Sequence, residues 1–443
     1  MLRREDIILR GGLIVTMNPR GDVLRGDVLI QNGRITQIGK VTDKATHEID
    51  CRNLVLLPGL VQTHVHLCQT LFRGQADDLS LLDWLQKRIF PLEAGLDPAA
   101  MRISARLGIT ELIKSGTTTI LDMGSVRYYD VIFEELEHSG LRAIGGKCMM
   151  DLEETTPKEL LETTKQSLEE TERLAKMWHG CDDGRLRYAV SPRFAVSCTQ
   201  ALLKDAASLA RENGYLLHTH ASESRDEIAI IEKRVKLSNI HYLHQNGFTG
   251  RDVTLAHCIW LGGMEKQLIV DTNTAVAHCP SSNLKLASGI APLLDYISRN
   301  VRVGLGADGA ACNNNLDLFI EMRLAALIHK PRYGANAITA EQVVKLATIE
   351  GAKALNLDHE IGSIEVGKKA DIIGVVDLAV HSQPRRDIYG QLVYATMGRD
   401  VMLNIVDGRV LMENREIPHI DEEKTVHTAR EELKKLILRI AKK

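Results

Sequence analysis

Hydrophobic and polar residues alternate in short runs along residues 1–57, and turn residues interrupt these runs. The interruptions are Asn18-Pro19, Gly21-Asp22 and Asn32-Gly33, which are dipeptides typical of tight turns. Alternation with a period of two places one face of each run against a core. The segment is therefore predicted to form antiparallel strands.

From about residue 58 the pattern changes to short β-branched runs that alternate with helical patterns of ten or more residues. This alternation is typical of βαβ units around a parallel sheet. The eight predicted strands lie within residues 60–67, 117–124, 141–150, 186–194, 215–223, 253–260, 274–282 and 301–309. The strongest helical patterns cover residues 99–116 and 337–357. We therefore expect an α/β fold, a (β/α)8 barrel of the TIM type with its site at the C-terminal ends of the strands.

Strand patterns return after residue 361, with Asp407-Gly408 as a predicted hairpin turn. The two terminal strand sets are expected to join into one small β-sandwich beside the barrel. The predicted organisation is residues 1–57 and 361–418 for the sandwich, 58–360 for the barrel and 419–443 for a C-terminal helix. The apolar residues of that helix recur at helical spacing, so it is expected to pack on the surface or on a second subunit.

Composition narrows the class of partner. The 443 residues are 44% hydrophobic and 26% charged, and the net charge of -3 gives no reason to expect nucleic acid or an anionic membrane. The eight cysteines occur singly and are expected to be reduced, mostly buried thiols. The N-terminal residues fit neither a signal peptide nor a membrane span. We expect a cytoplasmic protein that acts on a small molecule, as a homodimer or homotetramer.

Metal-type side chains gather at the predicted strand ends. His64 and His66 lie two apart on the first barrel strand, so both side chains share a face and can grip one metal ion. Further candidates end the fifth to eighth strands: His218, His220, His257, His278 and Asp308. So many polar groups at one end of a barrel are costly without a shared ligand, which favours a metal site. Spacing alone leaves open whether His218 or His220 binds the metal.

Five ordered motifs resemble the amidohydrolase superfamily, specifically its aminohydrolase branch of purine, nucleoside and s-triazine enzymes: PGLVQTHVHL, HTHASES, LAHC, AHCPSSNLKLASG and GLGADGAACNNN. The resemblance implies metal ligands His64, His66, His220 and Asp308. It also implies that His257 bonds to the attacking water or the developing oxyanion, and that Glu223 shuttles protons. The fourth strand, RLRYAVSPRF, lacks the lysine of dinuclear members. One divalent ion is therefore expected, with zinc favoured and iron an alternative.

The implied reaction is hydrolytic deamination. Asp308 accepts a proton from the activated water, and Glu223 protonates the ring nitrogen next to the carbon that loses its amine. Glu223 can also be read as an acidic residue that merely opens the following helix. For His278, a substrate contact and a packed histidine are equally compatible with the sequence.

The substrate pattern is mixed. In methylthioadenosine and S-adenosylhomocysteine deaminases a glutamate holds the ribose diol, and the matching residue is Glu93. Gln69, Arg193 and Phe194 instead resemble guanine deaminases, although Arg193 can also serve as a structural ion-pair partner. We favour a 6-aminopurine nucleoside such as 5′-deoxyadenosine, methylthioadenosine or S-adenosylhomocysteine. Guanine or an s-triazine is the alternative, and a non-catalytic scaffold is disfavoured because every implied ligand is present.

Overall fold

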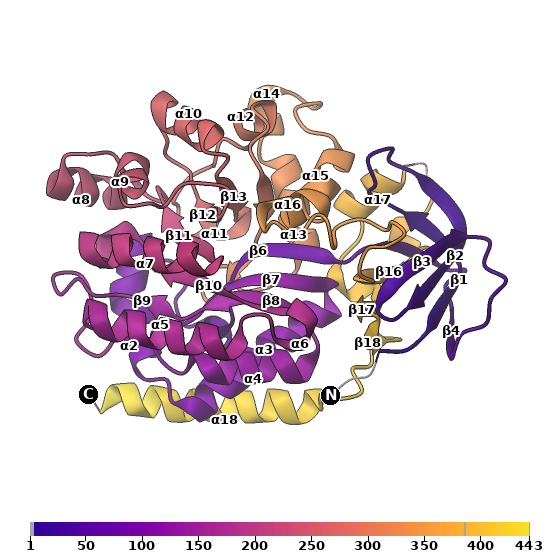
Figure 1. Ribbon diagram of the computed structural model, residues 1–443, viewed down its shortest axis with the longest axis horizontal. Coiled ribbons are helices and arrows are strands. Elements are labelled where there is room, and N and C mark those ends of the chain that lie inside the picture. Colours follow the sequence, from indigo (N-terminus) through magenta and orange to yellow (C-terminus); the bar gives the residue numbers. More distant parts are fainter. Residues whose placement is uncertain (1–3, 385–386, 443) are drawn as a thin grey trace.

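Eight parallel strands close into a barrel in the structure, a computed structural model that describes residues 4–384 and 387–442 (Figure 1). The strands are β6 (Leu60–His66), β7 (Thr117–Met123), β8 (Arg142–Gly146), β10 (Leu186–Pro192), β11 (Leu216–Ala221), β12 (Val253–His257), β13 (Ala275–His278) and β14 (Val303–Leu305). Leu305 of β14 pairs with Gln62 of β6 and closes the ring. All eight predicted strands are confirmed, as is the TIM-type fold. Two short strands, β9 (Cys148–Met149) and β15 (Asp308–Gly309), extend the C-terminal rim.

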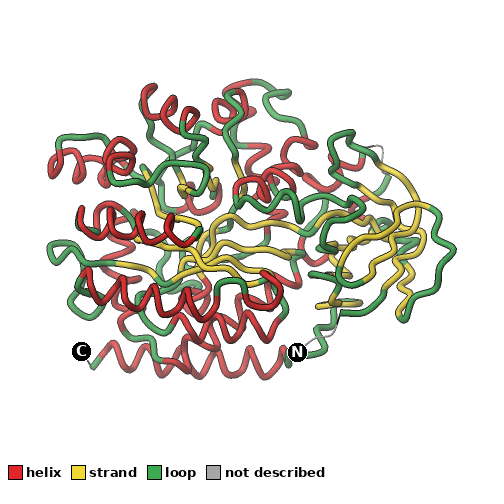
Figure 2. Tube along the Cα trace, in the orientation of Figure 1, coloured by secondary structure: helices red, strands yellow, loops and turns green. Residues whose placement is uncertain are grey.

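Helices surround the strands, as the red coils around the central yellow strands show (Figure 2). The longer ones are α3 (Pro98–Lys114), α4 (Tyr129–Ser139), α5 (Thr164–Trp178), α7 (Gln200–Asn213), α8 (Arg225–Val235), α10 (Gly263–Asp271) and α13 (Leu318–Leu327). Side chains cap the N-termini of several of these helices. Asp97 caps α3, Thr163 and Gln166 form a capping box at α5, and Ser224 and Glu227 form one at α8. Among the described helices, none has the length and hydropathy that crossing a membrane requires.

The helix predicted over residues 337–357 is divided into α15 (Ala340–Leu346) and α16 (Ile349–Ala354). Thr348 between them has non-helical dihedrals of φ -129° and ψ -98°. The carbonyl of Ala347 accepts a hydrogen bond from the backbone N–H of Val61 in β6. The break lets the chain cross the base of the barrel, a tertiary contact that local periodicity does not report.

The two terminal segments form one mixed sheet beside the barrel. Its strands are β1 (Ile7–Val15), β2 (Val23–Gln31), β3 (Arg34–Gly39), β4 (His47–Asp50), β5 (Leu54–Pro58), β16 (Ile372–Val376), β17 (Val401–Val406) and β18 (Arg409–Glu413). The expected sandwich thus takes the form of a single continuous sheet around its own hydrophobic core. Asn32-Gly33 and Asp407-Gly408 make the predicted hairpin turns, with φ between 52° and 78° at all four residues.

Two helices of the C-terminal part return to the barrel. Helix α17 (Ile388–Tyr394) packs on α13 and α15, and α18 (Glu422–Ala441) packs along α3 and α2 (Phe90–Ala94). Figure 1 shows α18, in yellow, beneath the indigo and purple helices. Leu436 of α18 is fully buried, whereas Ile437 and Leu438 remain exposed. The predicted C-terminal helix is therefore present and lies on its own barrel.

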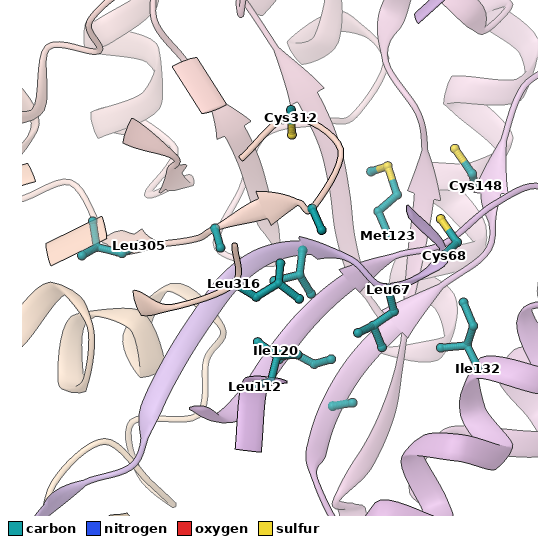
Figure 3. Close-up of a cluster of buried hydrophobic side chains, with 14 of the residues drawn as sticks. Leu67, Cys68, Leu112, Ile120, Met123, Ile132, Cys148, Leu305, Cys312 and Leu316 are labelled. Carbon is teal, nitrogen blue, oxygen red and sulfur yellow. The ribbon is translucent and has the colours of Figure 1, made fainter. Parts of the chain in front are cut away.

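One large hydrophobic core connects the barrel interior with the surrounding helices. Figure 3 shows part of it, where Leu67, Leu112, Ile120 and Leu316 come from segments distant in sequence. The eight cysteines carry free thiols, and all except Cys181 are buried, as expected. The chain after β14 packs closely against β6, and this packing requires glycine at position 306. A Cβ atom there would lie 2.7 Å from the backbone oxygen of His64.

A buried ion pair joins the barrel to the small sheet. The Nε and Nη2 atoms of Arg142 in β8 donate to both carboxylate oxygens of Asp371, at 2.7 and 2.9 Å. The backbone N–H of Asp407 donates to the same carboxylate at 2.8 Å. Both charged side chains are almost fully buried, so each depends on the other for compensation.

Replacing Asp371 with alanine is expected to lower the free energy of unfolding by about 3–5 kcal/mol, because the buried Arg142 guanidinium loses its hydrogen-bonded carboxylate and keeps only the more distant Asp407, at 3.9 Å. Denaturant titration followed by circular dichroism measures the change. Asp50→Ala is the control: its ion pair with Arg52 is solvent-exposed, so a change of about 0.5 kcal/mol or less is expected. Equal effects of the two substitutions would show that the buried pair does not hold the parts together.

Candidate metal centre and active site

Four side chains converge at the C-terminal rim of the barrel. His64 and His66 end β6, His220 lies near the end of β11 and Asp308 begins β15. One ligand atom from each lies within 4.8 Å of the others, so the four side chains could hold one metal ion. Spacing alone left His218 and His220 as alternatives, the family resemblance implied His220, and the structure brings His220 into this group.

The hydrogen bonds of the imidazoles fix their orientation. The Nδ1 atoms of His66 and His220 lie 2.7 Å from the backbone oxygens of Met123 and Arg193. A carbonyl oxygen accepts, so each Nδ1 carries the proton and each Nε2 keeps its lone pair. His64 also carries its proton on Nδ1, because of its neighbour His218. His218 Nδ1 donates to the Thr254 carbonyl at 2.8 Å, so His218 Nε2 is free to accept from His64 Nδ1, also at 2.8 Å. All three Nε2 lone pairs are therefore available to one ion.

The distances within this group fit a divalent metal. Asp308 Oδ1 lies 3.3 Å from His64 Nε2 and 3.2 Å from His66 Nε2, and the Nε2 atoms of His66 and His220 are 3.3 Å apart. Tetrahedral ligands held about 2.0–2.2 Å from zinc lie roughly 3.3–3.6 Å from one another. The Nε2 atom of His64 is buried and has no hydrogen-bond partner among the described residues. A bound cation would satisfy it.

The charge states also suit a cation. Burial lowers the pKa of His64 to about 4 and moves that of His220 well below its ordinary value, so both rings are neutral at neutral pH. Burial opposes ionisation of Asp308, but the imidazoles of His64 and His66 beside it hold its pKa well below the usual range. For His66, burial lowers the pKa, but the interaction with Asp308 outweighs burial and raises it.

Backbone conformation near the centre is strained. Asp308 has φ of 62° and His257 has φ of 73°, in the left-handed region that residues with a Cβ rarely adopt. Such conformations persist where the surrounding structure imposes them and cluster at functional sites. The strained backbone aims both side chains at the centre.

Glu223 and His257 flank the four ligands. Glu223 follows β11 and is 4% exposed, so it is not a solvated acid at the start of α8. Burial, reinforced by the negative charges of Asp308 and Glu227, raises the pKa of Glu223 well above its ordinary value. His257 Nε2 lies 3.5 Å from Glu223 Oε2, and its Nδ1 bonds to Asn283 Oδ1 at 2.8 Å. A buried carboxyl group with a raised pKa thus lies beside an imidazole that has one free nitrogen.

A narrow pocket opens onto this group. It is lined by His66, Leu81, Trp84, Leu85, Arg193, Phe194, His220, Glu223, His257, Leu286 and Asp308. Its free volume is about 20 Å³, room for about one water molecule. Entry of anything larger requires outward movement of a wall. The apolar wall formed by Leu81, Trp84 and Leu85 belongs to α1 (Leu81–Trp84) and the wide turn η2 (Leu85–Ile89).

The two predicted sets of substrate residues meet in one buried cluster. Arg193 Nη1 and Nη2 donate to the two carboxylate oxygens of Glu93 at 2.7 and 3.1 Å, and Gln69 Nε2 donates to Glu93 Oε1 at 3.0 Å. Arg193 also lies over the Phe90 ring, 5.2 Å from its centroid. Arg193 is therefore an ion-pair partner of Glu93, a possibility that the sequence left open, and it lines the pocket as well.

His278 lies apart from these residues. It ends β13 and is 1% exposed, and its ring centroid is 6.4 Å from that of His329. Burial lowers the pKa of His278 to about 3. Of the residues that the structure describes, those lining the pocket include neither His278 nor Glu93 nor Gln69.

Several neighbours of the site were not identified from the sequence. Asn283 orients His257, and the Ser282 hydroxyl donates to Asp308 Oδ2 at 2.7 Å. Both lie in the AHCPSSNLK motif, where adjacent polar residues just after a strand are the detectable feature. Leu81, Trp84 and Leu85 have the spacing of one helix face, which is also the spacing of an ordinary core helix.

Comparison with known proteins agrees with this geometry. A model of the amidohydrolase family matches residues 55–411. The 5′-deoxyadenosine deaminase of Methanosarcina acetivorans is 40% identical over 437 residues, which are 98% of this chain and 99% of the relative. The 5-methylthioadenosine/S-adenosylhomocysteine deaminase of Thermococcus onnurineus is 40% identical over 413 residues, 93% of this chain and 95% of the relative.

A crystal structure of an adenosine deaminase from Xanthomonas campestris with bound zinc has a TM-score of 0.92 to this chain at 30% identity. The superposition covers 98% of this chain and 99% of the other. The family model, the relatives of nearly equal length and the similar fold all indicate the same family. This chain belongs to the amidohydrolase family.

Proposed function

We propose that this protein is a hydrolytic deaminase of 6-aminopurine nucleosides of the 5′-deoxyadenosine, methylthioadenosine or S-adenosylhomocysteine type, releasing ammonia and the inosine-type product. The observation that carries the proposal is the buried Glu223, with its raised pKa, next to a buried group of three histidines and one aspartate. A buried acid with a raised pKa beside a metal group suits protonation of a ring nitrogen during hydrolysis. The relatives at 40% identity, which carry the names of such deaminases, support the substrate class.

The proposed cofactor is one divalent metal ion held by His64, His66, His220 and Asp308, with zinc favoured. Three imidazole nitrogens and one carboxylate oxygen are suitable zinc ligands. Zinc is also the metal in the similar adenosine deaminase structure. Strand β10 carries no lysine that could bridge a second ion. Lys147, at the rim after β8, is instead paired with Glu162 and Ser167.

The proposed mechanism assigns a proton or a charge to each side chain. A divalent ion in this position acts as a Lewis acid that brings the pKa of a water molecule toward neutrality. Asp308 is the proposed acceptor of the water's proton, because it is ionised and the Ser282 hydroxyl orients its Oδ2 atom. Glu223 donates a proton to the ring nitrogen beside the reacting carbon, which makes that carbon electrophilic. His257 Nδ1 donates to Asn283, so its Nε2 keeps a lone pair and can accept a hydrogen bond from the attacking water; this atom lies 3.5 Å from Glu223 Oε2 and 3.9 Å from Asp308 Oδ2.

Substrate recognition is proposed to involve the Glu93 cluster. A carboxylate has about four lone-pair positions, and Arg193 and Gln69 occupy three of those of Glu93. One position remains for a ribose hydroxyl, which reaches the buried Glu93 only if the pocket widens, because Glu93 does not line the pocket as it stands; Phe194 supplies an apolar wall. Guanine is the second candidate, because Arg193 and Gln69 carry donors suited to its polar edge. Those donors are already committed to Glu93, which favours the nucleoside.

The remaining predictions stand as proposals. The boundaries of the barrel at residues 58 and 360, a homodimeric or homotetrameric assembly and a cytoplasmic location follow from the sequence alone. A substrate contact by His278 would need a rearrangement, since the ring lies near His329.

The proposed activity predicts ammonia release by the purified zinc-loaded protein from 5′-deoxyadenosine, methylthioadenosine and S-adenosylhomocysteine. Guanine and s-triazines are assayed in parallel and are expected to be poorer substrates by at least about tenfold in kcat/KM, since they have no ribose for Glu93. Faster release from guanine would replace the nucleoside assignment with a guanine deaminase. Release from none of these compounds would contradict a deaminase.

Glu223→Gln is expected to lower kcat by about two or more orders of magnitude while the metal stays bound, because the proton donor is lost and no ligand is. The readouts are ammonia release and metal content by atomic absorption. Glu232→Gln, an exposed glutamate of the following helix α8, serves as the matched control. Near-normal turnover in Glu223→Gln would remove Glu223 from the mechanism.

His218→Leu is expected to weaken metal affinity by about 10–100-fold, because His64 then loses the acceptor that fixes its proton on Nδ1. Competition with a chelator measures the affinity of the folded fraction. His244→Ala, an exposed histidine of α9 (Asn239–Gln245), should leave it unchanged. Unchanged affinity in His218→Leu would mean that the bond between His64 and His218 does not position the ligand.

A further inference from the structure

A buried carboxylate that the proposed mechanism does not use lies on α13. Glu321 is fully buried, as are its apolar helix neighbours Phe319 and Met322. Of the residues that the structure describes, neither the four that form the metal group nor those that line the pocket include it. A charged group in such surroundings costs free energy unless hydrogen bonds compensate it, so its position needs an explanation.

Three hydrogen bonds compensate Glu321. Its Oε2 atom accepts from the backbone N–H of Ser281 at 3.0 Å, and Oε1 accepts from the Ser281 hydroxyl and, at 2.8 Å, from Asn313 Nδ2. All three partners act as donors, which suits an ionised carboxylate, because that form only accepts. Burial raises the pKa of Glu321 to about 7, and the bonds from Ser281 and Asn313 oppose this shift. Ser281 belongs to α11 (Pro280–Lys285), so Glu321 joins α13 to a second helix.

Helix α11 carries two groups that orient side chains of the active site. The Ser282 hydroxyl donates to Asp308 Oδ2 at 2.7 Å. Asn283 Oδ1 accepts from His257 Nδ1 at 2.8 Å. Successive residues of a helix are rotated by about 100° from one another, so a single turn can present Ser281, Ser282 and Asn283 to three different partners. Anchoring Ser281 by both its backbone and its hydroxyl therefore fixes the turn on which the other two depend.

A second connection runs from Glu321 through Asn313 to the backbone beside Asp308. The Nδ2 atom of Asn313 donates both to Glu321 and, at 2.8 Å, to the carbonyl oxygen of Ala307. Ala307 directly precedes Asp308, whose φ of 62° the surrounding structure has to impose. Glu321 is thus connected to Asp308 twice, to its carboxylate through α11 and to its backbone through Asn313.

We propose that Glu321 is a positioning residue for the metal centre, which sets the relative orientation of Asp308 and His257 by holding α11 and Asn313 on α13. The inference rests on the proposed metal-dependent function and adds a group that acts only through other residues. Removing hydrogen bonds that orient metal ligands typically weakens metal affinity by about 10–100-fold. Since Glu321 is not among the described residues that line the pocket, substrate affinity should change far less than turnover.

A purely structural role for Glu321 is the alternative, since a buried carboxylate with three donors also stabilises the fold. The two roles differ in where the effect of a substitution appears. A structural role changes only the free energy of unfolding. A positioning role also changes the surroundings of the metal ion in the protein that remains folded.

The test substitutes Glu321→Gln in the full-length protein. Glutamine keeps the size of the side chain, but in either orientation its amide nitrogen, a donor, faces a donor of Ser281 or Asn313. Both proteins are loaded with Co²⁺, whose visible absorption depends on ligand geometry. The variant is expected to show a changed cobalt spectrum and a Co²⁺ affinity weaker by about 10–100-fold in competition with a chelator. Its kcat for nucleoside deamination should fall by about tenfold or more, and its KM should change by less than about threefold.

Glu265→Gln is the matched control. Glu265 of α10 is a buried glutamate whose two carboxylate oxygens accept from the backbone N–H groups of Ile240 at 3.1 Å and Gly262 at 2.8 Å. Its substitution creates the same conflict between donors, away from α11 and Asn313. It is expected to lower the free energy of unfolding while the cobalt spectrum and the Co²⁺ affinity stay unchanged.

The inference is overturned if folded Glu321→Gln keeps the original cobalt spectrum and affinity, or if Glu265→Gln alters both to the same extent. Should Glu321→Gln not fold, Glu321→Asp takes its place with the same readouts, because it keeps the charge and shortens the side chain by one methylene group. An original protein that binds Co²⁺ but deaminates no substrate contradicts the proposed function alone, since the spectrum and the affinity still decide this inference. An original protein that binds no Co²⁺ contradicts both.

Discussion

The structure depends on the burial of four metal-binding side chains at one end of a hydrophobic barrel. His64, His66, His220 and Asp308 place their ligand atoms within 4.8 Å of one another, and all four are buried or nearly so. Without a shared cation, the lone pairs of the imidazole nitrogens and the carboxylate oxygens repel one another in a medium of low dielectric constant. The strained φ of Asp308 is a second local cost. A fold that keeps these features has to be stabilised elsewhere, and the burial of apolar side chains in the continuous core provides that stability.

The barrel backbone does more than carry the ligands, because it also sets their tautomers. The carbonyls that accept from His66 and His220, and through His218 from His64, belong to Met123 in β7, Arg193 directly after β10 and Thr254 in β12. Each ligand on one strand is therefore oriented by the end of another. A change in the register of any of these strands would move the carbonyl and release the Nδ1 proton that keeps Nε2 free. The strand register that closes the barrel therefore also fixes the geometry of the metal ligands.

Strands, turns and the metal ligands could be predicted from the sequence, because each leaves a local pattern. Alternation marked the strands, and the HxH spacing together with family motifs marked the ligands. The break at Thr348 could not be predicted, since it arises from a hydrogen bond between Ala347 and Val61, 286 positions apart in the chain. Alternation alone did not separate His218 from His220, because it gives both the same face; the family motif indicated His220, and the contact of His218 with His64 gives the physical reason.

The substrate end of the pocket shows why specificity was the hardest feature to predict. Glu93, Gln69 and Arg193 resemble residues of two different enzyme groups, and read singly they indicate two different substrates. In the fold they form one hydrogen-bonded cluster, so none of them acts alone. Arg193 also holds His220 through its backbone carbonyl. A change in the residue that pairs with Glu93 is thereby transmitted to a metal ligand, and selection for a new substrate at this cluster must preserve the backbone position of Arg193.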